Sequence, residues 1–497
     1  MLSEAVAGAA HHHGLRPAVV LGDRAMSWAE VHLAAEAMAP LLAARGVGRG
    51  SVVALALPSG PEWVVAATAV DRVGAVIAGI SPVATAPERS AMVEAVAADL
   101  VLAGPGLVEG LPLRTEVVEM SVGGLVAEPG APPPPVVPDH DRSGSRGYAV
   151  CFTSGTTGAP KAAAFSVDRA RAVQRIDVGP DLDAVRGTGA PMIASTQFAH
   201  VGFVLKLPWY AALGCTLHVM PRWRADDAVE LLAAHRMPAL GVVAPQLALI
   251  LRSPLLDERD LSALRLVIAG GAPSPPALVA EARERLGVDY SIRWSSTESG
   301  GVGLAALVDD AHPEAVGTIG TPRPGVSARV ADADGRALPD GEVGELQLLS
   351  PATMDGYLGE PGATAAAFTG DGWLRTGDLV SVRGDGRFVL AGRAGDMYIR
   401  GGYNVHPAEV EAVLGTHPCV EAVAVVPRAD EVMGEVGVAV VVTAAGCDPP
   451  TLADLRAHGA PRLARHKLPE AVVHVPGLPL TDAAKLDRRA LARTVRR

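Results

Sequence analysis

The stretch at residues 153–161 combines residue types that can bind phosphate. It consists of Thr153, Ser154, Gly155, Thr156, Thr157, Gly158, Ala159, Pro160 and Lys161. An apolar run at Tyr148–Phe152 precedes it and predicts a buried strand. Such a loop can surround phosphate oxygens with backbone N–H groups and hydroxyls, while the lysine contributes a point charge. It is not a Walker A loop, because Lys161 follows Pro160 and is not followed by Ser or Thr. By itself the stretch also fits a Ser/Thr/Gly-rich turn, so its interpretation depends on other motifs.

Segments further along the chain add groups that suit a nucleotide. Gly270–Pro273 directly follows a predicted strand, where glycine lets the backbone approach a flat ring closely. Trp294 places an aromatic plane four residues before the carboxylate of Glu298. Asp378 follows Thr376 and Gly377 on a tight turn and could accept two sugar hydroxyls, although such an aspartate is often only a turn former. The remaining candidates are Arg393, Asp396, Gly401 and Gly402 near an apparent domain boundary, and Lys485 near the end of the sequence.

The order of predicted elements indicates an α/β protein. A strand at Val52–Leu57, a helix at Glu62–Val73 and a strand at Ala75–Ile80 form a βαβ pattern. This pattern predicts a parallel sheet covered by helices. A helix is predicted at Ala29–Arg45, with Gly46 as its C-cap. A Pro/Gly-rich segment that peaks at Pro132–Pro135 is interpreted as a linker.

The pattern of elements changes twice after about Thr318. First come short alternating strands with Gly-containing turns, which predict a β-rich subdomain. After Gly392 an α+β pattern of roughly a hundred residues predicts a small separate domain. The expected fold is therefore a multi-domain α/β protein. Its large N-terminal domain, residues 1–394, has α/β-layered subdomains and a β-rich subdomain, and a small α+β domain follows at 395–497.

Composition narrows the class of protein. The net charge is −11, from 43 basic and 54 acidic residues, so nonspecific binding to nucleic acid or an anionic membrane is not expected. We expect neither a signal peptide nor a membrane-spanning segment, because the sequence shows no basic region followed by an apolar core and no run of 18 apolar residues. Four cysteines are widely spaced without a CxxC pair, which fits a reducing cytoplasm best. The expected location is cytoplasmic.

Together these motifs resemble the adenylate-forming superfamily of acyl-CoA synthetases, adenylation domains and beetle luciferases. The resemblance covers nearly the whole chain with the motifs in the family's order. It extends to segments between them, such as GEVGELQLLSPATMDGYLG, WLRTGD and NVHPAEVEAVL. Each motif is weak alone, but their order over about three hundred residues makes a chance resemblance small. The resemblance implies an AMP-forming ligase that uses ATP, Mg²⁺ and coenzyme A (CoA).

The resemblance also implies roles for single residues. The 153–161 loop would hold the β- and γ-phosphates of ATP, and Glu298 would help to hold Mg²⁺. Trp294 would stack on adenine opposite Gly271, Ala272 and Pro273, while Asp378 would bind the ribose with Arg393 nearby. Lys485 would bridge the substrate carboxylate and the α-phosphate. The remaining implied contacts are Ser295 and Ser296 for the nucleotide, Thr297 for catalysis, and Phe198, His200, Lys206, Gly270, Ser295, Gly401 and Gly402 for the acyl substrate or the thiol.

These residue types fit the chemistry that the family performs. A carboxylate attacks the α-phosphate, and Mg²⁺ and a lysine stabilise the charge that builds on the oxygens. In the family the C-terminal domain then rotates, which withdraws the lysine and opens the path of the thiol; such a hinge lets one site run two half-reactions. We therefore expect a mobile C-terminal domain that carries Lys485.

Several positions depart from the family pattern. Ser295 replaces a glycine at the wall of the acyl pocket, and Ala484 replaces the glycine before the catalytic lysine. Gly395 stands where the family keeps an Asp or Lys as the hinge, which leaves φ unrestricted. Lys206 lies in an otherwise apolar segment. It could extend to the surface or pair with a polar or anionic group of the substrate. Ser295 and Lys206 favour a compact, aromatic or functionalised acid over a long acyl chain.

The leading interpretation is an AMP-forming acyl-CoA synthetase for a small, medium or aromatic carboxylic acid. One alternative is a freestanding adenylation enzyme that loads the pantetheine of a separate carrier protein. A second is a divergent biosynthetic relative that performs one half-reaction or activates an unusual oxyanion such as nitrite. A non-enzymatic binding module is disfavoured, because Lys485, Glu298 and Asp378 would not all be needed to hold a ligand.

Overall fold

The computed structural model describes residues 1–112, 115–120, 146–153, 161–181, 183–220, 222–272, 274–394, 398–400, 403–430, 432–480 and 486–495. They fall into two units. The first unit comprises Met1–Val316, Gly320–Ala328 and Leu348–Leu374, and the second comprises Gly317–Ile319, Arg329–Gln347 and Arg375–Arg497. The boundary predicted between residues 394 and 395 lies inside the second unit and stays a prediction. The linker predicted at Pro132–Pro135 lies outside the described residues.

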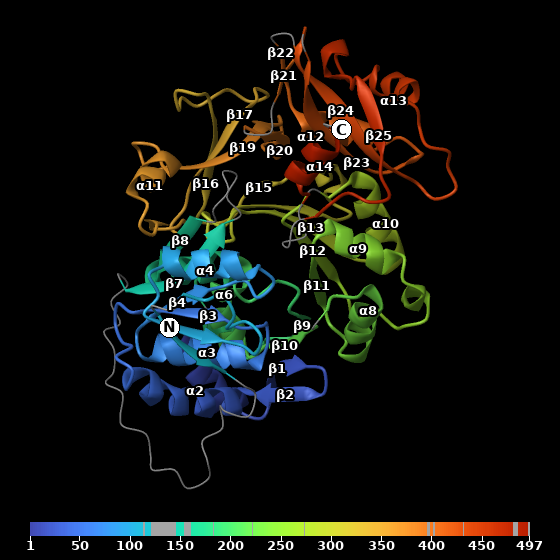
Figure 1. Ribbon diagram of the computed structural model, residues 1–497. Helices are drawn as coiled ribbons and strands as arrows, with labels where there is room; N and C mark the ends of the chain where they lie inside the picture. The colour runs from blue at the N-terminus through green and yellow to red at the C-terminus, as the bar shows by residue number, and fades with distance from the viewer. Residues whose placement is uncertain are drawn as a thin grey trace. The chain divides into compact units, whose positions relative to one another are not determined.

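The sheet that carries the start of the 153–161 loop belongs to the first unit. Its strands, in spatial order, are β18 (Gly356–Tyr357), β8 (Lys161–Ser166), β7 (Gly147–Thr153), β4 (Val76–Gly79), β3 (Val52–Ala56), β5 (Leu100–Ala103) and β6 (Glu116–Glu119). β3 and β4 pair in parallel, with Val53 opposite Ile77, and α3 (Pro61–Arg72) connects them. This confirms the predicted βαβ unit. In Figure 1, α4 (Ala86–Ala95) covers one side of this sheet, and α3 followed by α2 (Trp28–Ala43) covers the other.

Helix α2 shows how local sequence sets an element's ends. Ser27 and Glu30 form a capping box: the Glu30 N–H donates to Ser27 Oγ at 3.2 Å and the Ser27 N–H to Glu30 Oε2 at 2.7 Å. The helix ends at Ala43, earlier than the predicted stop at Gly46. Gly46 instead has φ of +78°, so it turns the chain just beyond the helix. The prediction of the helix was right, and its C-terminal end was placed too late.

Two more sheets complete the first unit. One has the order β2 (Arg24–Ser27), β1 (Pro17–Leu21), β10 (Thr216–Val219) and β9 (Pro191–Ile193). The other has the order β11 (Ala239–Val242), β12 (Leu266–Gly270), β13 (Asp289–Trp294), β14 (Leu304–Val308) and β15 (Thr321–Pro322). The other helices of this unit are α1 (Leu2–His13), α5 (Val167–Val178), α6 (Val201–Val204), α7 (Leu207–Leu213), α8 (Ala225–Ala234), α9 (Ala244–Leu251), α10 (Pro276–Leu286) and α11 (Pro361–Ala367). One apolar core joins β11, β12 and β13 to α8, α9 and α10.

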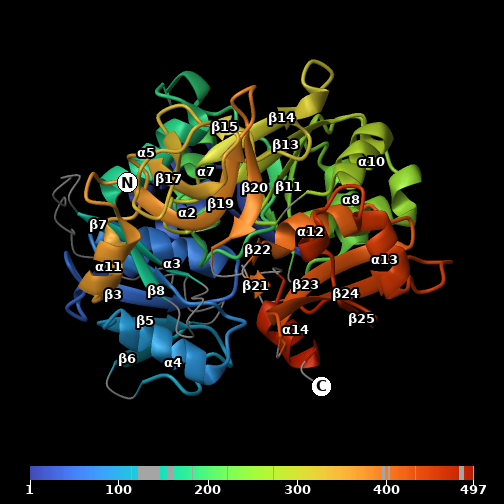
Figure 2. The same ribbon diagram turned by 90° about the horizontal axis from the view of Figure 1, so that it is seen from above.

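The second unit begins with the predicted β-rich region. Its strands are β16 (Ser327–Ala331), β17 (Gly344–Leu349), β19 (Leu374–Val382) and β20 (Phe388–Arg393), and β19 and β20 are antiparallel. A further sheet contains β22 (Tyr403–Val405), β21 (Tyr398–Arg400), β24 (Gly434–Thr443), β23 (Val420–Asp430) and β25 (Ala471–His474). Helices α12 (Pro407–Leu414) and α13 (Leu452–Gly459) pack on one face of this sheet and α14 (Arg488–Val495) on the other (Figure 2). Alternate residues of β24 pack on α12 and α13 or on α14, so this sheet is buried on both faces.

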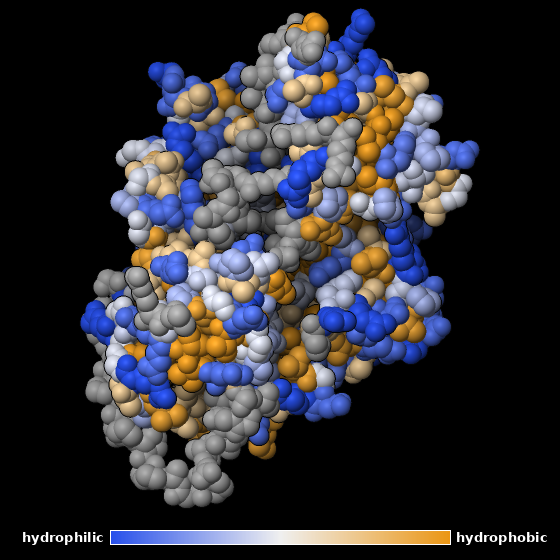
Figure 3. Space-filling view, in the orientation of Figure 1, coloured by the Kyte–Doolittle hydropathy of each residue, from blue (hydrophilic) through white to orange (hydrophobic). Residues whose placement is uncertain are grey.

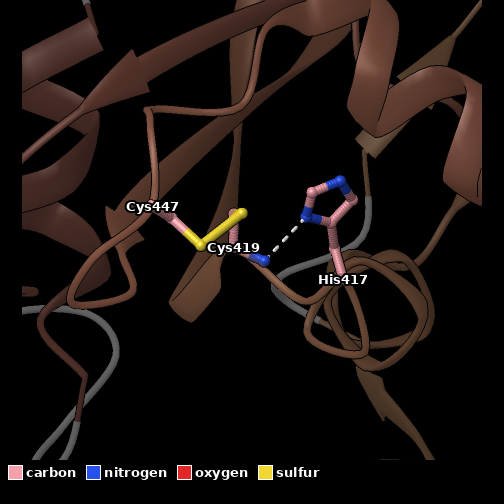
Figure 4. Close-up of a disulfide and its surroundings, with 3 residues drawn as sticks. All are labelled: His417, Cys419 and Cys447. Carbon is pink, nitrogen blue, oxygen red and sulfur yellow. Dashed lines mark hydrogen bonds between the residues drawn. A yellow bond between two sulfur atoms is a disulfide. The ribbon is translucent and has the colours of Figure 1, made fainter.

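Two of the four cysteines are joined, contrary to the expectation of reduced thiols. Cys419 and Cys447 form a disulfide with a Cα–Cα distance of 5.5 Å, and the Cys419 N–H donates to His417 Nδ1 at 3.1 Å (Figure 4). The bond ties the start of β23 to the loop after β24. Cys151 and Cys215 are free and buried, and burial raises the pKa of Cys215 to about 12. These two thiols are therefore inert at neutral pH.

On the face drawn in Figure 3, hydrophilic residues cover most of the described surface and hydrophobic residues gather in separate patches. Among the described residues, no helix has both the length and the apolar character needed to cross a bilayer.

Candidate functional site

The two ends of the 153–161 loop lie on neighbouring strands. Thr153 ends β7 and Lys161 begins β8, and the two residues are directly paired in the antiparallel register. The loop therefore starts and ends on adjacent antiparallel strands. Ser154, Gly155, Thr156, Thr157 and Gly158 lie outside the described residues. Their contact with phosphate stays a prediction.

Glu298 is held by a tight turn after β13. The Ser296 N–H donates to Ser299 Oγ at 2.9 Å, and the Ser299 N–H donates to Ser296 Oγ at 3.1 Å. Ser299 is fully buried, and Gly300 and Gly301 follow with φ of +76° and +72°. Because Ser299 and both glycines are constrained, the turn fixes the backbone from which the Thr297 and Glu298 side chains project. The predicted roles of Ser295 and Ser296 in nucleotide binding and of Thr297 in catalysis are not tested by these contacts.

Tyr357 connects Glu298 to the predicted phosphate loop, and sequence reasoning missed it. Its hydroxyl donates to Glu298 Oε1 at 2.8 Å, and the Lys161 Nζ lies 5.0 Å from its ring centroid, within cation–π range. Burial, reinforced by the Glu298 charge, raises the pKa of Tyr357 well above its ordinary value, so it remains a hydrogen-bond donor. Tyr357 lies on β18, which pairs with β8. The available signal was the resemblance of its segment, which contains GYLG, to the family; no role was assigned to that segment.

Glu298 fits a magnesium ion bound largely by a nucleotide. Among the described residues no group of three His, Cys, Asp or Glu side chains could hold a metal ion. Mg²⁺ is commonly bound by one or two carboxylates together with substrate phosphates and water. Tyr357 donates to one oxygen of Glu298, so the other carboxylate oxygen is available to a metal ion. The donor set is therefore compatible with Mg²⁺ carried by ATP.

Trp294 ends β13 beside the predicted adenine segment. Its side chain is buried, and a Cβ at Gly303 would lie 2.8 Å from its ring, so only glycine fits there. Gly303 is therefore a packing position against the Trp294 ring. Gly270 lies opposite Arg293, and Gly271 has φ of +75°. Gly271 and Ala272 thus follow β12 as predicted, and Pro273 lies outside the described residues.

The predicted acyl segment occupies the helices α6 and α7. His200 is the N-cap of α6 and is half-buried. Phe198 is fully buried and stacks on Phe203 with ring centroids 3.6 Å apart, so it supports the segment from inside. Lys206 lies between the two helices, and its Nζ is 2.9 Å from Asp177 Oδ2. Its ammonium is therefore paired within the protein instead of extending into solvent. The substrate contacts proposed for these residues stay predictions.

In the second unit the structure brings Asp378 and Arg393 together. They face each other on β19 and β20, and Arg393 Nε donates to Asp378 Oδ1 at 2.6 Å. The Thr376 hydroxyl accepts from the Asp378 N–H at 3.1 Å, and Gly377 has φ of +71°. Asp378 therefore lies within strand β19 and not on the predicted tight turn, and its carboxylate can still accept further hydrogen bonds. Its contact with ribose is a proposal.

Further predicted residues also lie outside the described ones. They are Asp396, Gly401, Gly402 and Lys485, together with the departures at Gly395 and Ala484.

Comparison with known families covers most of the chain. The model described as AMP-binding enzyme matches residues 6–358, and that described as AMP-binding enzyme C-terminal domain matches residues 409–485. A fatty acid–[acyl-carrier-protein] ligase of Streptomyces coeruleorubidus is 31% identical over 97% of this chain and 94% of its own length. An indoleacetate–CoA ligase of Aromatoleum aromaticum is 30% identical over 98% of this chain and 97% of its own length. The solved structure of an amide bond synthetase from Marinactinospora thermotolerans has a TM-score of 0.85 at 29% identity and covers all of both chains.

Proposed function

Because the chain belongs to the AMP-binding enzymes of the adenylate-forming superfamily, we propose that it is an AMP-forming acyl-CoA synthetase. It would join a small, medium or aromatic carboxylic acid to AMP, with release of pyrophosphate, and then transfer the acyl group to the thiol of CoA. The chain is an enzyme of the acid–thiol ligase class, and the proposal concerns its acid and its acceptor.

The observation that carries this proposal is the array Lys161–Tyr357–Glu298. It combines a cation at the end of the predicted phosphate loop, a neutral hydrogen-bond donor and a carboxylate directed by a rigid turn. Adenylation needs such groups, because charge builds on the phosphate oxygens during attack on the α-phosphate. Mg²⁺, when bound with ATP, would supply Lewis-acid stabilisation of that charge. Glu298 would hold it, and Tyr357 would fix the carboxylate in place.

Lys485 is proposed as the residue that orients the acid carboxylate against the α-phosphate. It lies within the segment matched by the C-terminal domain of the family. We propose that residues 395–497 act as the domain that alternates between the two half-reactions. Gly401 and Gly402 would then contact the thiol after the lysine has withdrawn.

A basic pocket in the second unit supports CoA as the acceptor. It has a volume of about 680 Å³ and is lined by Arg400, Met433, Arg456, Arg465, His466 and Glu470. Arg400 Nε donates to Glu470 Oε1 at 2.7 Å, so this arginine is neutralised while two others remain in the lining. Guanidinium groups bind phosphates well. CoA carries more phosphate groups than the pantetheine arm of a carrier protein. The pocket therefore favours CoA over a carrier protein.

The relatives also leave other acceptors open. One relative loads an acyl-carrier protein, and one structural relative is an amide bond synthetase. Pyrophosphate release should therefore be measured over a panel of acids with CoA, a pantetheinylated carrier protein, an amine or no acceptor. We expect release with at least one acid and formation of its CoA thioester. Activity that ignores every thiol would overturn the CoA assignment, and no release with any acid would favour the alternative of an unusual oxyanion.

The role of Lys485 has its own test. Lys485→Ala should lower adenylate formation about 100-fold or more, since a group that stabilises transition-state charge is lost. Thioester formation from a supplied acyl-adenylate should be largely retained. Arg493→Ala, at an exposed basic position of α14, is the matched control and should leave both steps unchanged. Equal loss of both steps in Lys485→Ala would contradict the alternation of the C-terminal domain.

A further inference from the structure

A buried carboxylate in the first unit lies among basic side chains from separate elements. Asp177, at the end of α5, is 7% exposed and pairs with Lys206 at 2.9 Å. Arg323, which follows β15, forms a second ion pair with the same carboxylate, and its other terminal nitrogen donates to the Ile176 carbonyl at 2.8 Å. Burial opposes ionisation of Asp177, but the charges of Lys206 and Arg323 outweigh it and lower the pKa. Asp177 is therefore ionised and already has two cationic partners.

Arg293 adds another cation on the same sheet as the strand before Arg323: it pairs with Ala305 of β14, which pairs with Thr321 of β15, two residues before Arg323. It lies on β13 and is half-buried, and its Nε donates to Ser291 Oγ at 2.8 Å. Burial and the nearby charge of Arg323 lower the pKa of Arg293, while the charge of Asp177 opposes that shift. Within the part of the chain that the structure describes, a hydroxyl is the side-chain partner of this guanidinium, and no carboxylate pairs with it. Its terminal N–H groups therefore retain capacity for an acceptor.

The charges in this cluster do not balance. Among the described residues, Lys206, Arg293 and Arg323 carry three positive charges around the single carboxylate of Asp177. An uncompensated charge in a partly buried place is unfavourable, and an added anion would relieve it. A guanidinium with free terminal N–H groups matches a carboxylate through two parallel hydrogen bonds. The composition of the cluster thus suits an anion, and in an enzyme that activates organic acids that anion is a second carboxylate of the acid.

The cluster is continuous with the segments that carry the predicted acyl contacts. Arg293 lies opposite Gly270 and two residues before Ser295, both predicted acyl contacts, and Lys206 lies just after α6, the helix that His200 begins. The Arg323 N–H donates to the Gly303 carbonyl at 3.0 Å, and Gly303 packs on the Trp294 ring. Strand β13, helix α6 and the segment around Gly303 therefore place the charged cluster next to the predicted acyl site within one unit.

We propose that the acid activated by this enzyme carries a second carboxylate, and that the Arg293 guanidinium binds it. Lys206 and Arg323 hold Asp177 and keep the surroundings of Arg293 positive. This inference rests on the proposed function, since it names the class of acid for that same site. It assigns Arg293 as a specificity-determining residue, one that sequence reasoning did not single out. Lys206 acts through Asp177 and so positions the cluster.

The test is direct binding of matched acids without ATP, by calorimetry. The probes are linear dicarboxylates from succinate to suberate and the benzenedicarboxylates, each with the monocarboxylate of the same length. We expect at least one diacid to bind more tightly than its monoacid. Arg293→Leu should weaken that diacid roughly 10- to 100-fold and leave the monoacid unchanged, because only the diacid loses a charge-assisted pair. Arg293→Lys should give an intermediate loss, because a lysine keeps the charge without the two-point geometry.

Arg283→Leu is the matched control. Arg283 is also partly buried in the first unit but is already paired with Asp310 at 2.6 Å, so diacid binding should not change. Equal affinity for diacids and monoacids in the unaltered protein would overturn the inference. So would an equal loss of both ligands in a folded Arg293→Leu variant. If that variant fails to fold, an ω-amino acid of the same length tests the inference in the unaltered protein. It should bind more weakly than the monoacid. Equal or tighter binding would overturn the inference.

Pyrophosphate release separates this inference from the proposed function. Release with monoacids in preference to every diacid would leave the ligase assignment intact and contradict the second carboxylate. Preferential, Arg293-dependent binding of diacids without any pyrophosphate release would support the inference about the ligand and contradict the ligase assignment.

Discussion

Two partly buried ion-pair groups, one in each unit, differ in how their charges are matched. In the second unit Arg488 binds Glu411 through two hydrogen bonds of 2.8 and 2.9 Å, and it also donates to the Val425 carbonyl at 2.9 Å. The Val425 N–H donates to the same carboxylate at 2.7 Å. This pair joins α12, α14 and β23. In the first unit Asp177 faces an excess of cations.

The difference separates structural charge from charge kept for a ligand. A one-to-one bidentate pair whose remaining hydrogen-bonding groups are satisfied contributes to the fold and leaves little for another molecule. The Asp177 carboxylate fixes the two cations that pair with it. The guanidinium of Arg293 remains available to an anionic ligand. We therefore expect substitutions at Glu411 and Arg488 to change stability alone, whereas substitutions around Asp177 change stability or binding according to the residue.

Asp177→Asn should have the largest effect. It leaves Lys206 and Arg323 partly buried without their carboxylate, and breaking such a group costs about 3–5 kcal/mol. The free energy of unfolding of the first unit, measured by denaturant titration, checks this. Asp260→Asn is the control, because the pair of Asp260 with Arg236 is exposed and its loss should change the unfolding free energy little. A similar loss in both variants would remove the distinction between the buried group and the surface pair.

The same carboxylate predicts a pH dependence. The pKa of Asp177 in the folded protein is lowered from 3.8, so the unfolded chain binds the proton more readily. Its contribution to stability is therefore present above about pH 4 and is lost as the pH falls further. In Asp177→Asn that part of the acid dependence should be absent.

The disulfide should have the next largest effect, and in the second unit. Its cysteines are separated by 28 residues, and closing a loop of that size typically contributes about 2–4 kcal/mol. Reduction, or replacement of Cys419 and Cys447 by serine, should lower the unfolding free energy of the second unit by that amount and spare the first. Reductant should then have no further effect on the serine variant. If reductant leaves the unaltered protein unchanged, the two thiols do not pair in solution.

Arg488→Met should cost about 2 kcal/mol, less than the buried group because its side chain is 26% exposed. The loss should appear in the unfolding of the second unit, and diacid binding should stay unchanged. Glu411→Gln should show a similar loss, and the double variant should be little worse than either single one, since both remove the same pair. Additive losses would show that the two residues act separately.

The sequence predicted the scaffold better than the contacts of individual charges. The βαβ unit around Val52–Ile80 followed from local apolar patterns, because each element buries one continuous face. The turn predicted for Asp378 from its glycine and hydroxyl neighbours was wrong, because residues 374–382 pair with β20 as one strand. The partner of Lys206 could not be predicted, because Asp177 lies 29 residues away on another helix and the ion pair depends on tertiary packing. Lys206 was consequently considered only for the surface or the substrate.

Two other contacts were missed for the same reason. Cys419 and Cys447 lack a spacing signal and meet because β23 and β24 form a hairpin. Tyr357 reaches Glu298 because β18 joins the edge of the sheet beside β8, although the two residues are 59 positions apart. Pairing across sheets and between distant helices is set by the whole core, so it leaves little trace in a single sequence.

Tyr357→Phe should have the smallest effect. Here the Glu298 carboxylate is held by a neutral hydroxyl and not by a cation. Loss of the hydroxyl removes a hydrogen bond of about 1 kcal/mol to Glu298. Pyrophosphate release should therefore slow roughly 3- to 10-fold, and the Mg²⁺ concentration for half-maximal rate should rise, because the carboxylate is less well oriented. Tyr148→Phe is the control: its hydroxyl donates to the buried Val204 carbonyl, so it should lower stability without changing the Mg²⁺ requirement. If Tyr357→Phe changed stability alone, Tyr357 would belong with the matched pair at Arg488 as a structural contact, and Glu298 would be oriented by its turn without it.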